Sequence, residues 1–415
     1  MNFILIVRVG IISCILFFLG GCQMLSLRKD LHVMENIGSI EGLIVDPHKK
    51  QGQFWIELYQ DSMSPENLLD VRSSEDGQFH FYAKAGAYYI MAYQDSNFDY
   101  KLEKDDRVGF NVQAIRVGIG ENIDRIRIEL SENIGKTELV TKHNKFTSLW
   151  PGITNIGQVT TLSDPRFSTE NARRGLWEPL SFSMEVGPGV FFLEEFDPEK
   201  TPVLFVHGIG GSPKEWAPII NSMDRSRFQP WLLYYETGFP LDMSSQYLFH
   251  AMKYLHRVYP FDTAYLVAHS MGGLISASFI QQYQEAGSDY LKLFVSLATP
   301  WSGHEGADLG VRYAPVVIPV WRDMAPGSQF LLKVQDMKLP ENLPHYLLFA
   351  YQGNSMMTPG NDDGAVSIKS QLQLNRQYRA HKVYGIDTDH SGILQNLEVM
   401  NMVKQILNDE DSGVK

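Results

Sequence analysis

The fold of the second half of the chain is decided by "LVAHSMGGL", Leu266 to Leu274. Its first letters close an apolar run that has the length and composition of a buried strand. Ser270 follows this run, with Ala268 two residues before it and Gly272 two residues after it. Small residues at these positions predict that Ser270 is a nucleophile on a tight strand-to-helix turn; the alternative is a hydroxyl in a glycine-rich turn required for packing.

The sequence around Ser270 alternates between apolar strands and helix-like segments. The predicted strands are "PVLFVHG" and "PWLLYYE" before "TAYLVAHS", and "LKLFVSLATP", "HYLLFAYQG" and "HKVYGID" after it. Near-continuous apolar strands alternating with helices indicate an α/β domain, with a mostly parallel sheet covered by helices on both faces. Ser270 follows the third strand of this series.

Several motifs in this region carry a family resemblance. "AHSMG" fits the GxSxG pattern with alanine replacing the first glycine, "FVHGIGG" ends the first strand, and "SLATPWSGH" and "MAPGSQFLLKV" come later. With these motifs in this order, the region from about Gly175 to Leu407 resembles the α/β-hydrolases, and in particular bacterial lipases and esterases. The resemblance implies the α/β-hydrolase fold and a serine nucleophile. Ala268 and the additional N-terminal region depart from the family pattern.

The order serine, acid, histidine in α/β-hydrolases places the partners of Ser270 downstream of it. Asp363, in "GNDDGAVSIKSQ", is the predicted acid, because an aspartate followed by Gly-x-Val resembles the acid loop of many bacterial lipases. Asp362 is the neighbouring candidate, and Asp387 and Asp389 are fallback acids. The structural alternative is an acidic turn capped by glycine.

His390 is the predicted base, because "DTDHSGIL" lies between the last strand and the last helix, where a side chain can reach Ser270. His381 begins the last strand instead. His207 and His269 precede the nucleophile and are expected to be structural. In the expected mechanism His390 accepts the Ser270 proton, and the acid orients the imidazole and stabilises its charged form.

The resemblance also implies an oxyanion hole. We expect its donors to be the backbone N–H groups of Ile209, in the loop after the first strand, and Met271, which follows the nucleophile. No Cys/His cluster with metal-ligand spacing occurs in the sequence, and the expected chemistry requires no metal and no organic cofactor.

The N-terminus "MNFILIVRVGIISCILFFLGGCQ" predicts export. Residues 1–22 contain one positive charge, Arg8, and an apolar run ending in "LGGC", which resembles the lipobox of bacterial lipoproteins. The resemblance implies cleavage before Cys22, acylation of Cys22 as a lipid anchor and, with Gln23 next, an outer-membrane location facing the periplasm. The alternative is an uncleaved transmembrane anchor.

The net charge of the chain disfavours polyanionic partners. The formal net charge is -12 and the pI is near 5.5, so bulk electrostatics disfavour binding to nucleic acids or anionic lipids. Both cysteines, Cys14 and Cys22, lie in the predicted signal, so the remaining chain is expected to contain no disulfide.

The remaining chain is divided by changes of pattern. Residues 23–36 are expected to be a polar tether, and residues 37–132 alternate with period two and predict a small antiparallel β-sandwich that loosely resembles transthyretin-like or carboxypeptidase-regulatory-like domains. Residues 133–174 are the expected connector and residues 175–410 the hydrolase domain. Within it, residues 301–344 are interpreted either as a cap over an acyl pocket or as an ordinary crossover.

These observations predict an envelope-anchored serine hydrolase, a carboxylesterase or lipase that cleaves small-molecule or lipid esters through an acyl-enzyme. The same triad could serve a thioesterase, amidase or acyltransferase. The alternative from another class is a non-catalytic envelope lipoprotein whose sandwich binds a partner of unknown identity.

Overall fold

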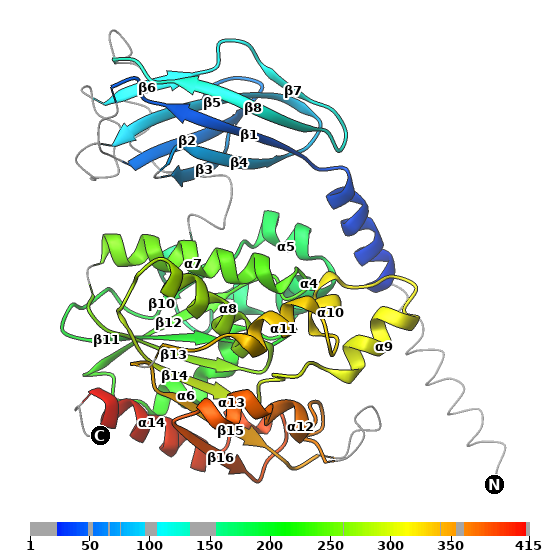
Figure 1. Cartoon of the computed structure of the whole chain (residues 1–415), viewed down its shortest axis with the longest axis vertical. Helices are drawn as coiled ribbons and strands as arrows, with labels where there is room; N and C mark the ends of the chain where they lie inside the picture. Colours follow the sequence, from blue (N-terminus) through cyan, green and yellow to red (C-terminus); the bar gives the residue numbers. More distant parts are fainter. Residues whose placement is uncertain are drawn as a thin grey trace, which may run out of the picture. The chain divides into compact units, whose positions relative to one another are not determined.

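The computed structural model describes residues 23–48, 53–64, 67–74, 76–95, 106–132, 155–259, 261–340, 342–353 and 361–411. The chain divides into two compact units (Figure 1). The N-terminal unit comprises residues 29–154, and the C-terminal unit comprises residues 155–415 together with 1–28. The predicted signal, with Cys22, lies outside the described residues. A helix spans residues 23–35, where a polar tether was expected. None of the described helices combines the length and apolar character needed to cross a membrane.

Eight described strands form the sheet of the C-terminal unit: β9 (Ile156–Val159), β10 (Gly189–Phe192), β11 (Thr201–Val206), β12 (Phe228–Tyr234), β13 (Ala264–His269), β14 (Leu291–Leu297), β15 (His345–Ala350) and β16 (Lys382–Ile386). Their order is β16-β15-β14-β13-β11-β12-β10-β9. The six strands predicted from the sequence, β11 to β16, are parallel neighbours. β10 runs antiparallel to β12, and β9 lies at the edge beside β10.

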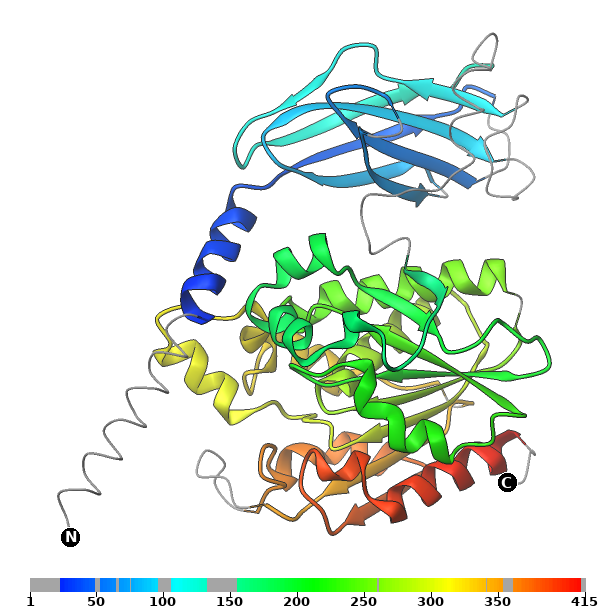
Figure 2. The same cartoon turned by 180° about the vertical axis from the view of Figure 1, so that it is seen from behind.

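Helices cover both faces of this sheet. α6 (Ala217–Ser222) and α14 (Leu397–Asp411) lie on one face, and α7 (Leu241–Val258) and α8 (Met271–Glu285) lie on the other, as both views show (Figures 1 and 2). Both faces are therefore buried, which explains the near-continuous apolar runs of the strands. The other helices are α4 (Thr169–Trp177), α5 (Pro179–Glu185), α9 (Glu305–Tyr313), α10 (Pro319–Met324), α11 (Gln329–Asp336), α12 (Ile368–Gln371) and α13 (Leu374–Arg379), with the short 3-10 helices η2 (Pro165–Phe167), η3 (Pro213–Trp216) and η4 (Gly392–Leu394).

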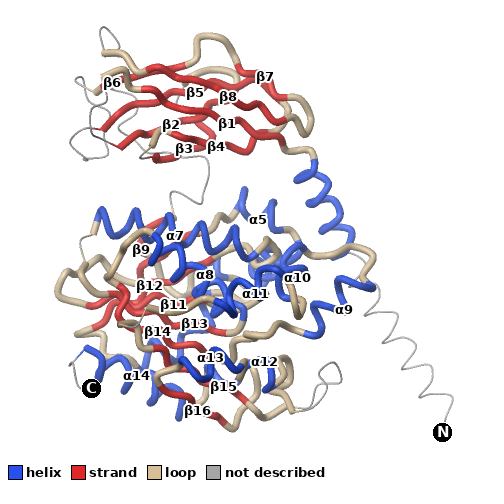
Figure 3. Tube along the Cα trace, viewed as in Figure 1, coloured by secondary structure: helices blue, strands red, loops and turns tan. Residues whose placement is uncertain are grey.

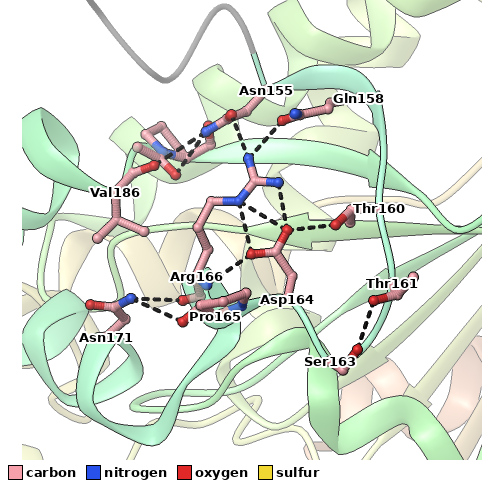
Figure 4. Close-up of polar contacts among 12 residues, drawn as sticks. Asn155, Gln158, Thr160, Thr161, Ser163, Asp164, Pro165, Arg166, Asn171 and Val186 are labelled. Carbon is pink, nitrogen blue, oxygen red and sulfur yellow. Dashed lines mark hydrogen bonds and ion pairs between the residues drawn. The ribbon is translucent and has the colours of Figure 1, made fainter.

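The segment 155–174 belongs to the C-terminal unit, although it was expected to be connector. A polar network attaches it to the fold (Figure 4). Buried Asn155 donates to the carbonyl oxygens of Val186, Gly187 and Pro188 at 3.3 Å each and accepts a bond from Arg166 Nη1 at 2.9 Å. The same segment adds β9 to the sheet, so the unit begins about twenty residues before the predicted boundary at 175.

The N-terminal unit contains two small sheets, whose strands are red in Figure 3. One contains β1 (Gly38–Val45), β4 (Gln78–Ala83) and β8 (Asn122–Glu129), and the other contains β2 (Gln53–Gln60), β3 (Leu68–Ser74), β5 (Gly86–Asp95), β6 (Arg107–Phe110) and β7 (Ile115–Val117). Ile40 and Phe81 from the first sheet pack in one cluster with Ile56 and Ile90 from the second. Pairing is antiparallel except between β1 and β8, which are parallel.

Candidate active site

Ser270 stands on a strained turn between β13 and α8. Its backbone has φ 54° and ψ -130°, a positive φ that is uncommon for a residue with a side chain. The turn requires close backbone approach: a Cβ on Gly272 would lie 2.4 Å from the Val206 oxygen, and one on Gly208 would lie 2.9 Å from Ser270 Cβ. The small residues around Ser270 therefore allow a tight turn that places Ser270 in the wall of a cavity, as the GxSxG pattern predicts.

The three predicted triad residues lie in one hydrogen-bonded row. His390 Nε2 is 2.9 Å from Ser270 Oγ, and His390 Nδ1 is 2.6 Å from Asp363 Oδ2. His390 follows β16 and Asp363 belongs to the loop after β15, so three strand ends supply the row. The Asp363 side chain is fully buried, whereas that of His390 is 16 % exposed. The imidazole thus links a buried carboxylate to the hydroxyl.

Hydrogen bonds on both oxygens hold the Asp363 carboxylate in place. Oδ1 accepts from the N–H groups of Ala365 at 3.0 Å and Val366 at 2.7 Å. Oδ2 accepts from Gln371 Nε2 at 3.0 Å as well as from His390. The backbone N–H of His390 also donates to the Asp363 carbonyl at 2.8 Å. A buried carboxylate that is bonded on both oxygens can fix the orientation and tautomer of the histidine.

The rival acids hold turns instead. Asp362 Oδ1 accepts from the Gly364 N–H at 2.7 Å. Asp389 Oδ1 accepts from the N–H groups of Ser391 and Gly392, and Asp387 is exposed. The structure therefore brings Asp363, rather than these neighbours, to the ring of His390.

The other predicted histidines occupy structural positions. His207 is fully buried and stacks on Tyr235 at 4.5 Å, and burial lowers its pKa to about 4. His269 Nε2 is 3.0 Å from the His390 carbonyl oxygen, and burial lowers the pKa of His269 to about 3. His381 is exposed and packs edge-on against Tyr346. Low pKa values keep the two buried rings neutral near pH 7.

Two backbone N–H groups are available beside Ser270. Met271 is the first residue of α8, where helix N–H groups lack intrahelical acceptors. Ile209 lies in the loop after β11, and that loop is anchored by the Gly210 N–H to Thr237 Oγ1 at 3.1 Å. Neither Ile209 nor Met271 donates its N–H to another described residue. The pair can serve an external acceptor.

A cavity of about 240 Å³ opens onto Ser270 and His390. Its lining is supplied by Gly208, Ile209, Glu215, His269, Ser270, His304, Met324, Ala365, Val366, His390, Ser391, Leu394 and Gln395. His304 precedes α9 and Met324 ends α10, so the segment 301–344 contributes to this wall. Sequence reasoning missed Glu215, His304 and Gln371 as site residues, because only the folded loops bring them to the site.

Ionisable groups in the wall are perturbed by burial. Burial raises the pKa of Glu215 to about 7 and lowers that of His304. Within the described residues, no group of three or more His, Cys, Asp or Glu side chains could hold a metal ion. Ser270, His390 and Asp363 are groups that serve nucleophilic and acid–base chemistry.

The sheet order, the strained serine turn and the positions of Asp363 and His390 define the α/β-hydrolase fold. Residues 239–410 match a family model described as an "Alpha/beta hydrolase of unknown function (DUF915)". No protein with a curated description matches the chain.

Solved structures with a similar backbone include the mature lipase BlEst2 of Bacillus licheniformis, with a TM-score of 0.42, 19% identity, and coverage of 52% of this chain and 94% of that one. The lin2722 product of Listeria innocua has a TM-score of 0.39 and 16% identity, covering 50% and 94%. A carboxylesterase structure from Nitrososphaera gargenis has a TM-score of 0.37 and 10% identity, covering 55% and 97%.

Proposed function

We propose that the protein is a serine hydrolase that cleaves carboxylic esters through an acyl-enzyme. The observation that carries the proposal is the continuous row from Asp363 through His390 to Ser270, with spacings of 2.6 and 2.9 Å. Such a row lowers the barrier to attack because the base lies within hydrogen-bond reach of the nucleophile and a third group orients the base.

In the proposed mechanism Ser270 Oγ attacks the ester carbonyl while His390 Nε2 accepts the hydroxyl proton. The N–H groups of Ile209 and Met271 donate to the oxyanion that forms. His390 then gives its proton to the departing alcohol, which leaves the acyl group on Ser270. Water, deprotonated by His390, attacks this acyl group, and collapse of the second tetrahedral species releases the acid and restores the serine.

The cavity supports a small substrate. Sites for drug-sized ligands occupy about 300–1,000 Å³, and the cavity beside Ser270 measures about 240 Å³. Apolar side chains from Ile209, Met324, Val366 and Leu394 provide part of the wall. We infer that short acyl esters are better substrates than long-chain lipids, which favours a carboxylesterase over a lipase.

The experiment is hydrolysis of p-nitrophenyl esters from acetate to laurate by the full chain and by Ser270→Ala. We expect the highest kcat/KM for short acyl chains and a loss of about 10⁴-fold or more in the variant. Equal activity in the two proteins would remove Ser270 as the nucleophile. Inactivity of both with esters, but turnover of thioesters or amides, would reassign the substrate; inactivity with all three would favour the scaffold alternative.

We further propose that the protein is anchored to the bacterial envelope through lipids on Cys22, at the outer membrane. Support comes from the sequence "LGGCQ" at residues 19–23 alone. Labelling of growing cells with radioactive palmitate should mark the wild-type chain and not Cys22→Ser. Retention of the label in that variant would contradict the anchor.

A further inference from the structure

Glu215 is the one acidic side chain in the described wall of the cavity. Among the described lining residues it is the only aspartate, glutamate, lysine or arginine. No ion pair joins it to a described lysine or arginine. A charged carboxylate in this position is therefore not neutralised by a neighbouring cation and acts on whatever enters the cavity.

The local fold holds Glu215 in the wall of the cavity that Ser270 also lines. Its side chain closes a capping box with Ser212 at the start of η3, where Oε1 accepts from the Ser212 N–H at 3.3 Å. A Cβ on Gly211 would lie 2.5 Å from Glu215 Oε1, so the loop passes directly over the carboxylate. Trp216, the next residue, is fully buried and fixes the backbone. The carboxylate thus has a defined place beside the loop that carries Ile209.

We propose that Glu215 selects substrates by charge, so that the site favours neutral and cationic esters and disfavours anionic ones. This inference rests on the proposed ester hydrolysis at Ser270. Glu215 and Ser270 line the same cavity of about 240 Å³, so a substrate charge held in it lies at a short separation from the carboxylate. At such a separation in a partly buried site, the interaction corresponds to roughly a tenfold effect on kcat/KM.

Other ionisable groups near Glu215 do not cancel this effect. His390 and the buried Tyr235 face it, and burial raises the pKa of Tyr235 so that its phenol stays neutral. His269 and His304 line the cavity with lowered pKa values and are neutral near pH 7. Because the raised pKa of Glu215 is about 7, its carboxylate is mostly charged at pH 8 and mostly neutral at pH 6.

The test uses three butyrate esters of similar size, made from 3-tert-butylphenol, 3-hydroxybenzoate and 3-(trimethylammonio)phenol. For the full chain, Glu215→Gln and the control Glu236→Gln, the kcat/KM of each charged ester is divided by that of the neutral ester. Comparing these ratios between the proteins cancels the intrinsic reactivity of the esters. Glu236 is a matched control: burial raises its pKa to about 7 as well, and it is not part of the described lining.

At pH 8 we expect Glu215→Gln to raise the anionic-to-neutral ratio about tenfold and to lower the cationic-to-neutral ratio by a similar factor. The Glu236→Gln ratios should stay within about twofold of the wild type. Without any substitution, the wild-type anionic-to-neutral ratio should rise severalfold from pH 8 to pH 6. His390 serves all three esters alike and therefore cancels in this ratio.

Charge selection alone would be overturned if the neutral ester is hydrolysed but Glu215→Gln leaves the charged-to-neutral ratios unchanged. It would also be overturned if the wild-type anionic-to-neutral ratio stays flat between pH 8 and pH 6. An equal change in Glu236→Gln would also overturn it, because the effect would then be indirect. Failure of the wild-type chain to hydrolyse any of the three esters would instead overturn the proposed function, and this inference with it.

Discussion

In the N-terminal unit buried charged side chains are paired with neighbouring side chains, whereas in the C-terminal unit several buried polar side chains, among them Ser270 and His269, line a cavity. Arg107 forms an ion pair with Asp46, and the Tyr59 hydroxyl donates to Glu57. This difference between the two units follows from the direction of their strands. In a parallel sheet all carboxyl ends meet at one edge, so loops that are distant in sequence converge there; antiparallel strands alternate their ends.

The first prediction has the largest expected effect. It distinguishes the roles of two adjacent aspartates in one of the converging loops. Asp363→Asn should lower kcat/KM for a short ester by about 10⁴-fold, because the amide cannot fix the required tautomer of His390. Asp362→Asn is the matched control and should cost less than about tenfold, since an amide oxygen can still accept from the Gly364 N–H. A larger loss in Asp362→Asn would reverse the assignment of the acid.

The second prediction concerns the loop that approaches Ser270. A methyl group at residue 208 would lie 2.9 Å from Ser270 Cβ and would displace the Ile209 N–H. We expect Gly208→Ala to lower kcat by about 10²–10³-fold, the usual cost of one oxyanion donor. Gly175→Ala is the control, because its added methyl would meet only ordinary contacts at 3.6 Å. Unchanged kcat in Gly208→Ala would exclude the loop from the oxyanion hole.

The third prediction is that acid destabilises the C-terminal unit in two stages. Burial lowers the pKa of His207 to about 4 and those of His269 and His345 to about 3, from 6.5, and raises those of Glu215 and Glu236 to about 7, from 4.5. Between pH 6.5 and 4.5 the unfolded chain binds three more protons at the histidines and two fewer at the glutamates. The free energy of unfolding therefore falls on acidification by about 1.4 kcal/mol per pH unit.

Below pH 4.5 the glutamates of the unfolded chain bind protons as well, so their opposing contribution shrinks and the slope steepens to about 2.5 kcal/mol per pH unit near pH 4. The total loss from pH 6.5 to pH 4 should be about 3 kcal/mol or more. Urea unfolding followed by tryptophan fluorescence measures it. His345→Gln should reduce this steeper slope by about half, and a stability that is flat from pH 6.5 to pH 4 would refute the prediction.

The last prediction has the smallest expected effect. It compares the loss of a buried polar contact in the C-terminal unit with the loss of an exposed ion pair in the N-terminal unit. Asn155→Ala removes the bonds to three carbonyls and to Arg166, and should lower the free energy of unfolding by about 2 kcal/mol. Arg127→Ala removes an exposed pair with Glu129 at 3.6 Å and should cost under about 0.5 kcal/mol. Equal effects in thermal unfolding would show that segment 155–174 is only loosely held.

Near-continuous apolar strands that alternate with helical segments made the parallel sheet predictable, and rules of chain order located Ser270 and His390. The short strands β6 and β10 have four residues each, too few for a pattern, and β9 lies in a stretch without periodicity. Asp363 could be separated from Asp362 only by resemblance, because the direction of each side chain depends on the turn. Glu215 could not be found, since "SPKEW" indicates a helix start and its approach to Ser270 depends on how the loop folds back.

The central claim is that Ser270 is a nucleophile activated by His390. The most direct measurement is reaction of the full chain with a fluorophosphonate, followed by peptide mass mapping, in the wild type and in His390→Ala. We predict one adduct on Ser270 in the wild type and labelling at least about 10³-fold slower in the variant. An unlabelled Ser270 in the wild type, or equal labelling rates in both proteins, would contradict the claim.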